Sequence, residues 1–129
     1  MSTKEIITDI SINDFKTLLN NIPNKIIILK FTADWCKPCH KIKTYVNDWF
    51  NKLPDNFIII EIDIDETMDL YYKLKTKKMV NGIPSILAYY GNTQRDMDKW
   101  FIPSDSVVGG NVDEINLFFT RSQLKGASM

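Results

Sequence analysis

The chain has 129 residues and a formal net charge of zero, with 25% charged and 44% hydrophobic residues. This length and composition fit one globular domain with its own core. The balanced charge argues against nucleic acid or an anionic membrane as the main partner, and no apolar run approaches the roughly 20 residues that span a bilayer. The first ten residues lack the apolar core of a signal peptide, so we expect an intracellular, cytoplasmic protein.

The N-terminal third of the sequence predicts a strand, a helix and a second strand. Residues 6–10 form a short apolar run that is typical of an edge strand. Ser11, followed three residues later by Asp14, matches the start of a helix. Residues 26–32 are almost continuously apolar and predict a central strand that is covered on both faces, with Lys30 as its single charged residue.

The middle third predicts a helix, a strand and a further helix. Pro38 falls in the first turn of a helical pattern that ends at Pro54, and a proline in the first turn costs no hydrogen bond. Residues 57–64 predict a second buried strand. Residues 65–67 are predicted to begin the next helix, because acidic side chains there and lysines over residues 73–78 would complement the helix dipole.

The C-terminal third predicts two strands and a final helix. Residues 85–90 and 107–108 have strand character, and Asn111 is placed to cap the last helix. The order βαβαβαββα implies an α/β protein with a mixed sheet and helices on both faces. We expect one domain, residues 1–125, followed by a disordered tail, residues 126–129.

The only two cysteines, Cys36 and Cys39, lie where the central strand leads into a helix. The unsatisfied N–H groups and the dipole of a helix N-terminus favour a thiolate, so Cys36 is the predicted nucleophile and Cys39, one turn along, the resolving thiol. A structural disulfide and a zinc site are the alternatives. For zinc, His40 is the nearest further ligand, but adjacent helix residues project about 100° apart, so His40 should point away from Cys39.

Together these features resemble the thioredoxin family over roughly residues 6–124. The resemblance rests on the strand before the cysteines and on three further features: Ala33-Asp34-Trp35-Cys36-Lys37-Pro38-Cys39, Gly82-Ile83-Pro84 and Gly109. It implies the thioredoxin fold, a central mixed sheet of about five strands flanked by about four helices. It also implies a cis Ile83–Pro84 bond that faces the cysteines.

The resemblance further implies roles for residues around the cysteines. Trp35 would shield the cysteines and offer partners a flat apolar contact, unless it packs in the core. Gly82, Ile83 and Pro84 would form a substrate groove in which the Ile83 backbone pairs with an extended substrate, unless Pro84 simply begins a strand. Gly109 would leave room at the rim of that groove or merely end a strand.

Three positions depart from the family pattern. Lys30 stands where the family has a buried aspartate that accepts the proton of the resolving thiol. Its ammonium group either stabilises the Cys36 thiolate or forms a salt bridge with Glu61 on the neighbouring strand. Lys37, in place of a glycine, either favours the thiolate or is an inert surface residue. Thr44 replaces a proline that kinks the helix, so a straighter helix is expected.

The segment 91–106 is longer than the hairpin usual in this fold. Its apolar residues, Trp100, Phe101 and Ile102, either pack against the core or form an exposed patch that binds a partner.

The sequence therefore predicts a protein-disulfide reductase with no bound cofactor beyond a redox-active Cys36–Cys39 disulfide. The expected partners are disulfide-containing proteins and an electron donor such as a thioredoxin reductase, and the chain is expected to be a monomer. Two alternatives stay open. One is an oxidase or isomerase, which Lys30 and Lys37 would favour, and the other is a non-catalytic module that holds a partner.

Overall fold

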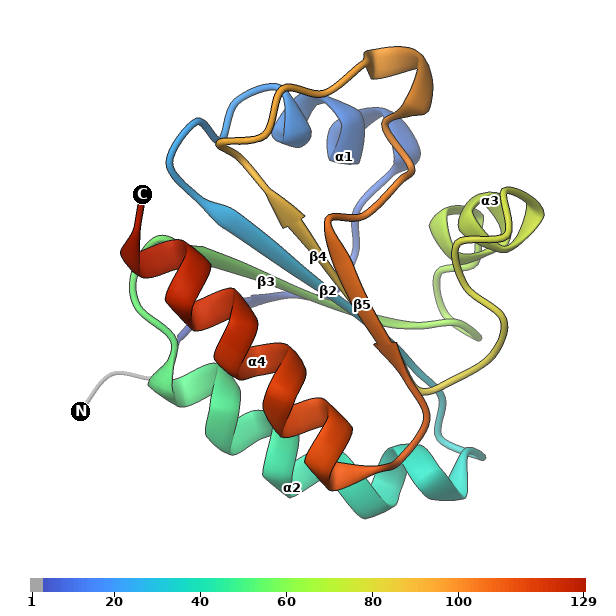
Figure 1. Ribbon diagram of the computed structural model, residues 1–129. Helices are drawn as coiled ribbons and strands as arrows, with labels where there is room; N and C mark the ends of the chain where they lie inside the picture. The colour runs from blue at the N-terminus through green and yellow to red at the C-terminus, as the bar shows by residue number, and fades with distance from the viewer. Residues whose placement is uncertain (1–3) are drawn as a thin grey trace.

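Residues 4–129, the part of the chain that the computed structural model describes, form one five-stranded mixed sheet and four α-helices (Figure 1). The strand order in the sheet is β1-β3-β2-β4-β5. The strands are β1 (Ile6–Ile7), β2 (Ile26–Thr32), β3 (Phe57–Asp63), β4 (Ser85–Tyr90) and β5 (Asp105–Val108). The helices are α1 (Ile12–Leu19), α2 (Lys37–Lys52), α3 (Asp69–Thr76) and α4 (Val112–Ala127), with a short 3₁₀ turn, η1 (Met97–Lys99).

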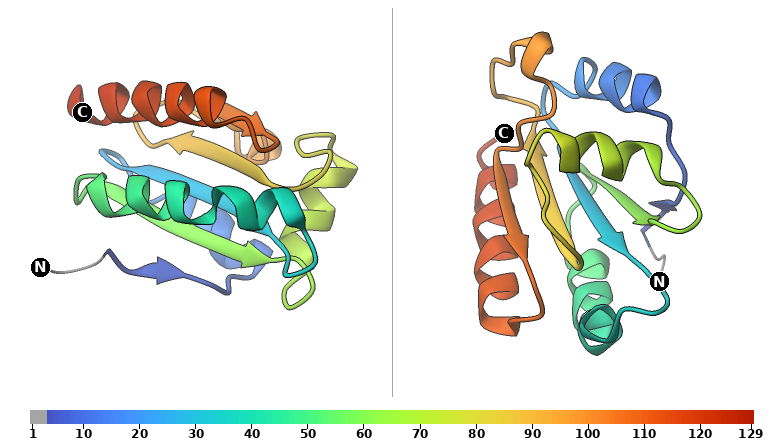
Figure 2. Two further views of the ribbon diagram at one scale, coloured as in Figure 1. Left: turned by 90° about the horizontal axis from the view of Figure 1, so that it is seen from below. Right: turned by 90° about the vertical axis from the view of Figure 1, so that its right-hand side faces the viewer.

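Strand β2 lies at the centre of the sheet and is buried over all but its last residue. It pairs parallel with β3 and antiparallel with β4, and its register sets Lys30 opposite Glu61. Helices α2 and α4 cover one face of the sheet, and α1 and α3 cover the other (Figure 2). Because both faces are covered, the strand has no polar face, which explains its continuous apolar run.

Two predicted helix starts are confirmed by side-chain caps. Ser11 accepts a hydrogen bond from the Asp14 N–H at 3.0 Å, and Asn111 accepts one from the Glu114 N–H at 3.0 Å. Helix α2 runs unbroken through Thr44.

The predicted start of α3 is wrong, because the helix begins at Asp69 and residues 64–66 form a turn. The Asp63 carboxylate accepts a hydrogen bond from the Asp65 N–H at 2.9 Å, and the Asp63 carbonyl accepts from the N–H groups of Glu66 and Thr67 at 3.0 Å. Short acidic side chains of this kind compete with the helix for backbone partners, so the acidic segment forms a turn instead.

The prediction of a disordered tail is also wrong for residues 126–127, because α4 continues to Ala127. Gly126 is buried, its carbonyl accepts a hydrogen bond from Asn56 at 3.1 Å, and a Cβ added there would lie 2.8 Å from the Phe57 ring. The domain therefore extends past residue 125 because this end of α4 packs against the start of β3.

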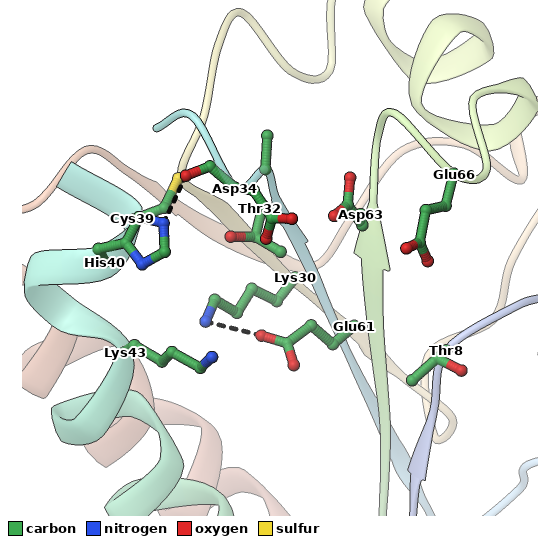
Figure 3. A pocket seen from close by; sticks show the side chains of 11 residues that line it. Thr8, Lys30, Thr32, Asp34, Cys39, His40, Lys43, Glu61, Asp63 and Glu66 are labelled. Carbon is green, nitrogen blue, oxygen red and sulfur yellow. Dashed lines mark hydrogen bonds and ion pairs between the residues drawn. The ribbon is translucent and has the colours of Figure 1, made fainter. Parts of the chain in front are cut away.

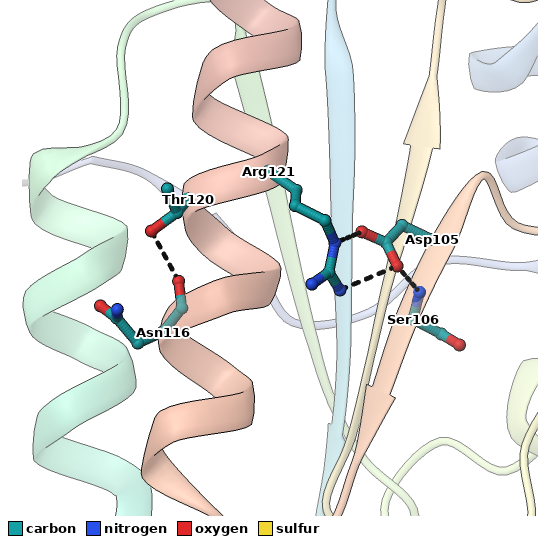
Figure 4. A network of polar contacts seen from close by, with 5 residues as sticks. All are labelled: Asp105, Ser106, Asn116, Thr120 and Arg121. Carbon is teal, nitrogen blue, oxygen red and sulfur yellow. Dashed lines mark hydrogen bonds and ion pairs between the residues drawn. The ribbon is translucent and has the colours of Figure 1, made fainter.

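Strand β5 begins two residues earlier than predicted and is tied to α4 by an ion pair (Figure 4). Arg121 binds the Asp105 carboxylate with both Nε, at 2.8 Å, and Nη2, at 3.2 Å. The same carboxylate accepts the N–H of Ser106 at 2.8 Å. This contact holds the edge strand against the last helix.

The long segment between β4 and β5 packs mainly against the core. Trp100 is 5% exposed and contacts the rings of Phe15 and Phe101, and the Tyr89 hydroxyl donates to the Phe101 carbonyl at 3.0 Å. Ile102 is 45% exposed. The packing alternative is thus correct for Trp100, while Ile102 remains at the surface. No helix within residues 4–129 is long and apolar enough to cross a membrane.

Candidate active site

The candidate site lies where β2 leads into α2, with Cys36 as the cap of the helix. The Cys36 Sγ accepts a hydrogen bond from the Cys39 N–H at 3.2 Å, and Pro38 occupies the first turn. Cys36 and Cys39 form a disulfide with a Cα–Cα distance of 5.2 Å, within the usual range. The sulfur of Cys36 thus takes the place that a serine or aspartate oxygen takes at other helix starts.

The electrostatic surroundings of Cys36 suit an anion. In the reduced protein, the capping N–H and the helix dipole would both stabilise a thiolate on Cys36. The first turn of α2 contains no acidic side chain, and exposed Lys37 adds a positive charge. Cys36 and Cys39 are 4% and 2% exposed, so a difference in reactivity between the two thiols would come from the cap rather than from accessibility.

Trp35 lies on the surface beside the cysteines and is 65% exposed. Its indole N–H donates to the Asp65 carboxylate at 2.8 Å, which fixes the ring across the turn that precedes α3. The core-packing alternative for Trp35 is therefore wrong. An exposed, oriented indole next to Cys36 is suited to contact a partner.

The loop of Gly82, Ile83 and Pro84, predicted to form the substrate groove, contacts the cysteines through Ile83. Ile83 packs against Cys36 and Cys39, and its peptide bond to Pro84, which is buried, is cis. Gly109 ends β5, as one alternative predicted, and its N–H donates to the Pro84 carbonyl at 2.8 Å. Gly82 and Gly109 both have positive φ angles, 143° and 93°, which few other residues adopt. The fold therefore brings Pro84 and Gly109, residues of the predicted groove, together from two separate loops.

Lys30 forms the salt bridge with Glu61 that the sequence offered as one alternative (Figure 3). The Lys30 Nζ lies 2.8 Å from Glu61 Oε2, with the side chains 1% and 22% exposed. The two residues are partners in the β2–β3 register, which makes the contact direct. Burying a lysine in this way requires such a partner.

The ion pair lines a cavity of about 150 Å³ that reaches Cys39 (Figure 3). The cavity wall includes Cys39 but not Cys36, so the ion pair and Cys39 border the same cavity. The other residues of this wall come from β2, α2, β3 and the adjoining loops: Thr8, Thr32, Ala33, Asp34, His40, Lys43, Asp63 and Glu66.

His40 does not point away from this region, contrary to the sequence-based expectation. Its ring lies on the same cavity wall as Cys39, and its Nε2 is hydrogen-bonded to the Asp34 carbonyl (Figure 3). The Asp34 carbonyl, in the turn before α2, binds the His40 ring and sets its direction. Helical spacing does not include this contact, so it could not predict the direction of the ring. Within residues 4–129, no group of three or more His, Cys, Asp or Glu side chains is arranged to hold a metal ion.

The sheet order and a Cys-x-x-Cys disulfide at the start of α2 define a thioredoxin-fold protein. Solved thioredoxins share this fold. The Trypanosoma brucei brucei thioredoxin superposes with a TM-score of 0.69 at 17% identity, covering 96% of this chain and 95% of that one. The Malassezia sympodialis thioredoxin gives 0.67 at 18% identity, covering 94% and 96%.

Sequence comparison identifies the family. The thioredoxin family model matches residues 6–101, so the chain belongs to the thioredoxin family. Thioredoxin from Ophiophagus hannah is 37% identical over 59 residues, which is 46% of this chain and 55% of that protein. Thioredoxin 3 from Plasmodium falciparum is 27% identical over 110 residues, 85% of this chain and 55% of that protein. The chain thus spans about half the length of these relatives.

Proposed function

We propose that the protein reduces disulfide bonds in other proteins by dithiol exchange through Cys36 and Cys39. The observation that carries this proposal is the capping geometry: Cys36 Sγ accepts the Cys39 N–H at the start of α2 and is already bonded to Cys39 Sγ. Membership of the thioredoxin family supports the same chemistry.

The exchange would proceed in two attacks. The Cys36 thiolate attacks one sulfur of the substrate disulfide, a bond forms between the two proteins, and the other substrate sulfur leaves as a thiolate. Cys39, once deprotonated, attacks Cys36 Sγ, and the second substrate sulfur leaves with the electron pair of the broken bond. Closure needs little movement, because the Cys36 and Cys39 Cα atoms are only 5.2 Å apart. A donor such as a thioredoxin reductase would then return two electrons.

The substrate would lie across Trp35 and the loop of Gly82, Ile83 and Pro84. Exposed Trp35 offers a flat apolar contact, and Ile83 packs directly against the cysteines. An extended substrate segment could pair with the Ile83 backbone as an added strand, and Gly109 would leave space at the rim.

Insulin reduction in the presence of dithiothreitol tests this function. We expect the wild-type protein to accelerate precipitation of the insulin B chain, Cys36→Ser to be inactive, and Cys39→Ser to accumulate a mixed disulfide. Lys41→Gln, an exposed change on the same helix, should retain full activity.

A wild-type rate equal to that of dithiothreitol alone would contradict the proposal. If partners were then bound equally well by wild type and Cys36→Ser, the chain would be a binding module instead.

An oxidising direction is a second candidate, favoured by exposed Lys37 beside Cys36, whereas the charge of Lys30 is balanced by Glu61. Positive charge that stabilises the reduced thiolates raises the reduction potential. Equilibration with glutathione separates the two directions, since a potential near about −270 mV suits a reductase and one near about −120 mV an oxidase.

The cellular setting follows from the same chemistry. We place the protein, as a monomer without a bound cofactor, in the reducing cytoplasm, where a dithiol can be maintained. Both cysteines of the chain belong to the exchange pair. Cell fractionation and size-exclusion chromatography test the location and the monomer, and trapping with Cys39→Ser identifies the substrates.

A further inference from the structure

The second attack requires Cys39 to lose its proton. Cys39 is 2% exposed, so bulk water has little direct access to its sulfur. The polar cavity of about 150 Å³ that borders Cys39 is large enough to admit several water molecules, which could carry that proton. A proton acceptor on the cavity wall would therefore serve the exchange.

Several charged groups of the wall are not free to accept a thiol proton. As ammonium groups, Lys30 and Lys43 have no lone pair. Glu61 Oε2 is already paired with Lys30 Nζ at 2.8 Å, and the Asp63 carboxylate accepts the Asp65 N–H at 2.9 Å. The remaining acidic side chains on the wall, Asp34 and Glu66, are exposed.

His40 has the geometry of an acceptor. Its Nε2 is hydrogen-bonded to the Asp34 backbone carbonyl, which can only accept, so Nε2 carries the hydrogen. In the neutral ring the lone pair then belongs to Nδ1. The ring lies on the wall of the cavity that also contacts Cys39 (Figure 3). Histidine is the side chain that most often serves as a general base in enzymes.

We propose that His40 Nδ1 accepts the Cys39 proton through water in this cavity when the mixed disulfide is resolved. The proton leaves Cys39 Sγ, the resulting thiolate forms the bond to Cys36 Sγ, and the Cys36–substrate bond breaks with its electron pair on the substrate sulfur. The imidazolium of His40, which is exposed, then releases the proton to bulk water, and the substrate sulfur leaves as a thiolate. This inference rests on the proposed dithiol exchange and assigns its proton-transfer step to a residue outside the Cys-x-x-Cys motif.

Stopped-flow reaction of the reduced protein with 5,5′-dithiobis(2-nitrobenzoate) isolates the step. Attack by Cys36 releases one thionitrobenzoate, and closure by Cys39 releases the second in a first-order phase. In His40→Gln the side-chain amide can still donate to the Asp34 carbonyl but cannot take up the proton. We expect its closure rate to fall about tenfold at pH 7 and its rate profile to move to higher pH, in keeping with general-base catalysis.

Two further variants separate proton transfer from structural effects. Added imidazole should restore part of the closure rate in His40→Ala but should leave wild type unchanged. Glu66→Gln, on the same wall, should match wild type in both rate and pH profile.

The proposal is overturned if His40→Gln closes at the wild-type rate throughout pH 5 to 9. It is equally overturned if Glu61→Gln, shown to be folded by its melting curve, displaces the profile while His40→Gln does not. A wild-type protein that releases only the first thionitrobenzoate would contradict the dithiol exchange itself, which distinguishes the two failures.

Discussion

At the scale of single residues, the site combines a capping sulfur with a buried charge pair. Cys36 caps α2, and Lys30 and Glu61 form an ion pair on the wall of the cavity that Cys39 also lines. The pair is neutral as a unit, and the attraction between its two charges offsets part of the cost of burying them. Losing either member leaves the other as an uncompensated charge in a largely buried place.

Lys30→Met should lower the free energy of unfolding by about 3 kcal/mol, near the lower end of the range for broken buried pairs because Glu61 keeps 22% of its side chain exposed. Urea denaturation monitored by tryptophan fluorescence measures the loss. The double variant Lys30→Met/Glu61→Gln should recover much of it, since no unpaired charge remains. A double variant less stable than Lys30→Met would show that the carboxylate has another important partner.

Breaking the charge balance between Lys30 and Glu61 is expected to change the redox properties of the cysteine pair. Lys30→Asp should make the reduction potential more negative, because a carboxylate beside the cavity disfavours thiolates, and each tenfold change in the equilibrium corresponds to about 30 mV. Equilibration with glutathione provides the measurement, with Lys37→Gln reporting separately on the surface charge beside Cys36. An unchanged potential in Lys30→Asp would remove electrostatic tuning by this lysine.

At the scale of elements, the position of the cysteines depends on how β2 enters α2. The strand is held on both sides, by β3 and β4, and the turn after Thr32 places Cys36 at the cap. Helix α1 lies on the opposite face of the sheet from α2 (Figures 1 and 2). Changes to the ends of α1 should therefore affect stability without altering the redox chemistry.

Ser11→Ala should destabilise the protein by about 1 kcal/mol, because the Asp14 N–H loses its capping partner. Ser11→Asp should remain close to wild type, since its carboxylate can accept the same hydrogen bond. Thermal and urea denaturation measure both variants, and insulin reduction should be equal in all three proteins. A cost for Ser11→Asp equal to that for Ser11→Ala would mean that the cap is not the source of the effect.

At the scale of the whole molecule, two apolar cores sandwich the sheet, and the segment between β4 and β5 closes one of them. Tyr89 joins that segment to the sheet, since its hydroxyl donates to the Phe101 carbonyl and Arg95 lies over its ring. Burial raises the pKa of Tyr89 far above its ordinary value of 10.0, and burial also raises the pKa values of Tyr71 and Tyr90.

These raised pKa values predict a loss of stability in alkali. Below pH 10 the tyrosines are protonated in both folded and unfolded chains, so their contribution is fully present. As the pH rises above 10, the unfolded chain loses protons that the folded chain retains, and the free energy of unfolding falls. Tyr89→Phe should cost about 1 kcal/mol at pH 7 through the lost hydrogen bond, yet weaken the dependence on pH above 10. Urea denaturation from pH 7 to 11 checks both effects, and parallel curves for the two proteins would contradict this role.

The sequence alone determined the features that depend on neighbours within a few residues. The burial of β2, the caps Ser11 and Asn111, and the cysteine pair at the start of α2 all follow from local patterns of apolar, capping and helix-breaking residues. Even the Lys30–Glu61 pair was among the predicted alternatives, because adjacent buried strands leave a charged side chain few other partners.

Only the tertiary structure decided where side chains meet across the sheet and its loops. It placed His40 beside the Cys39 cavity, fixed Trp35 to Asp65, joined Gly109 to Pro84, and packed Gly126 against Phe57. These contacts join residues brought together by chain reversals, and their energies depend on distances that no local pattern contains. Local propensity fixes which backbone a segment adopts, whereas the stacking of strands and helices fixes which of its atoms can touch.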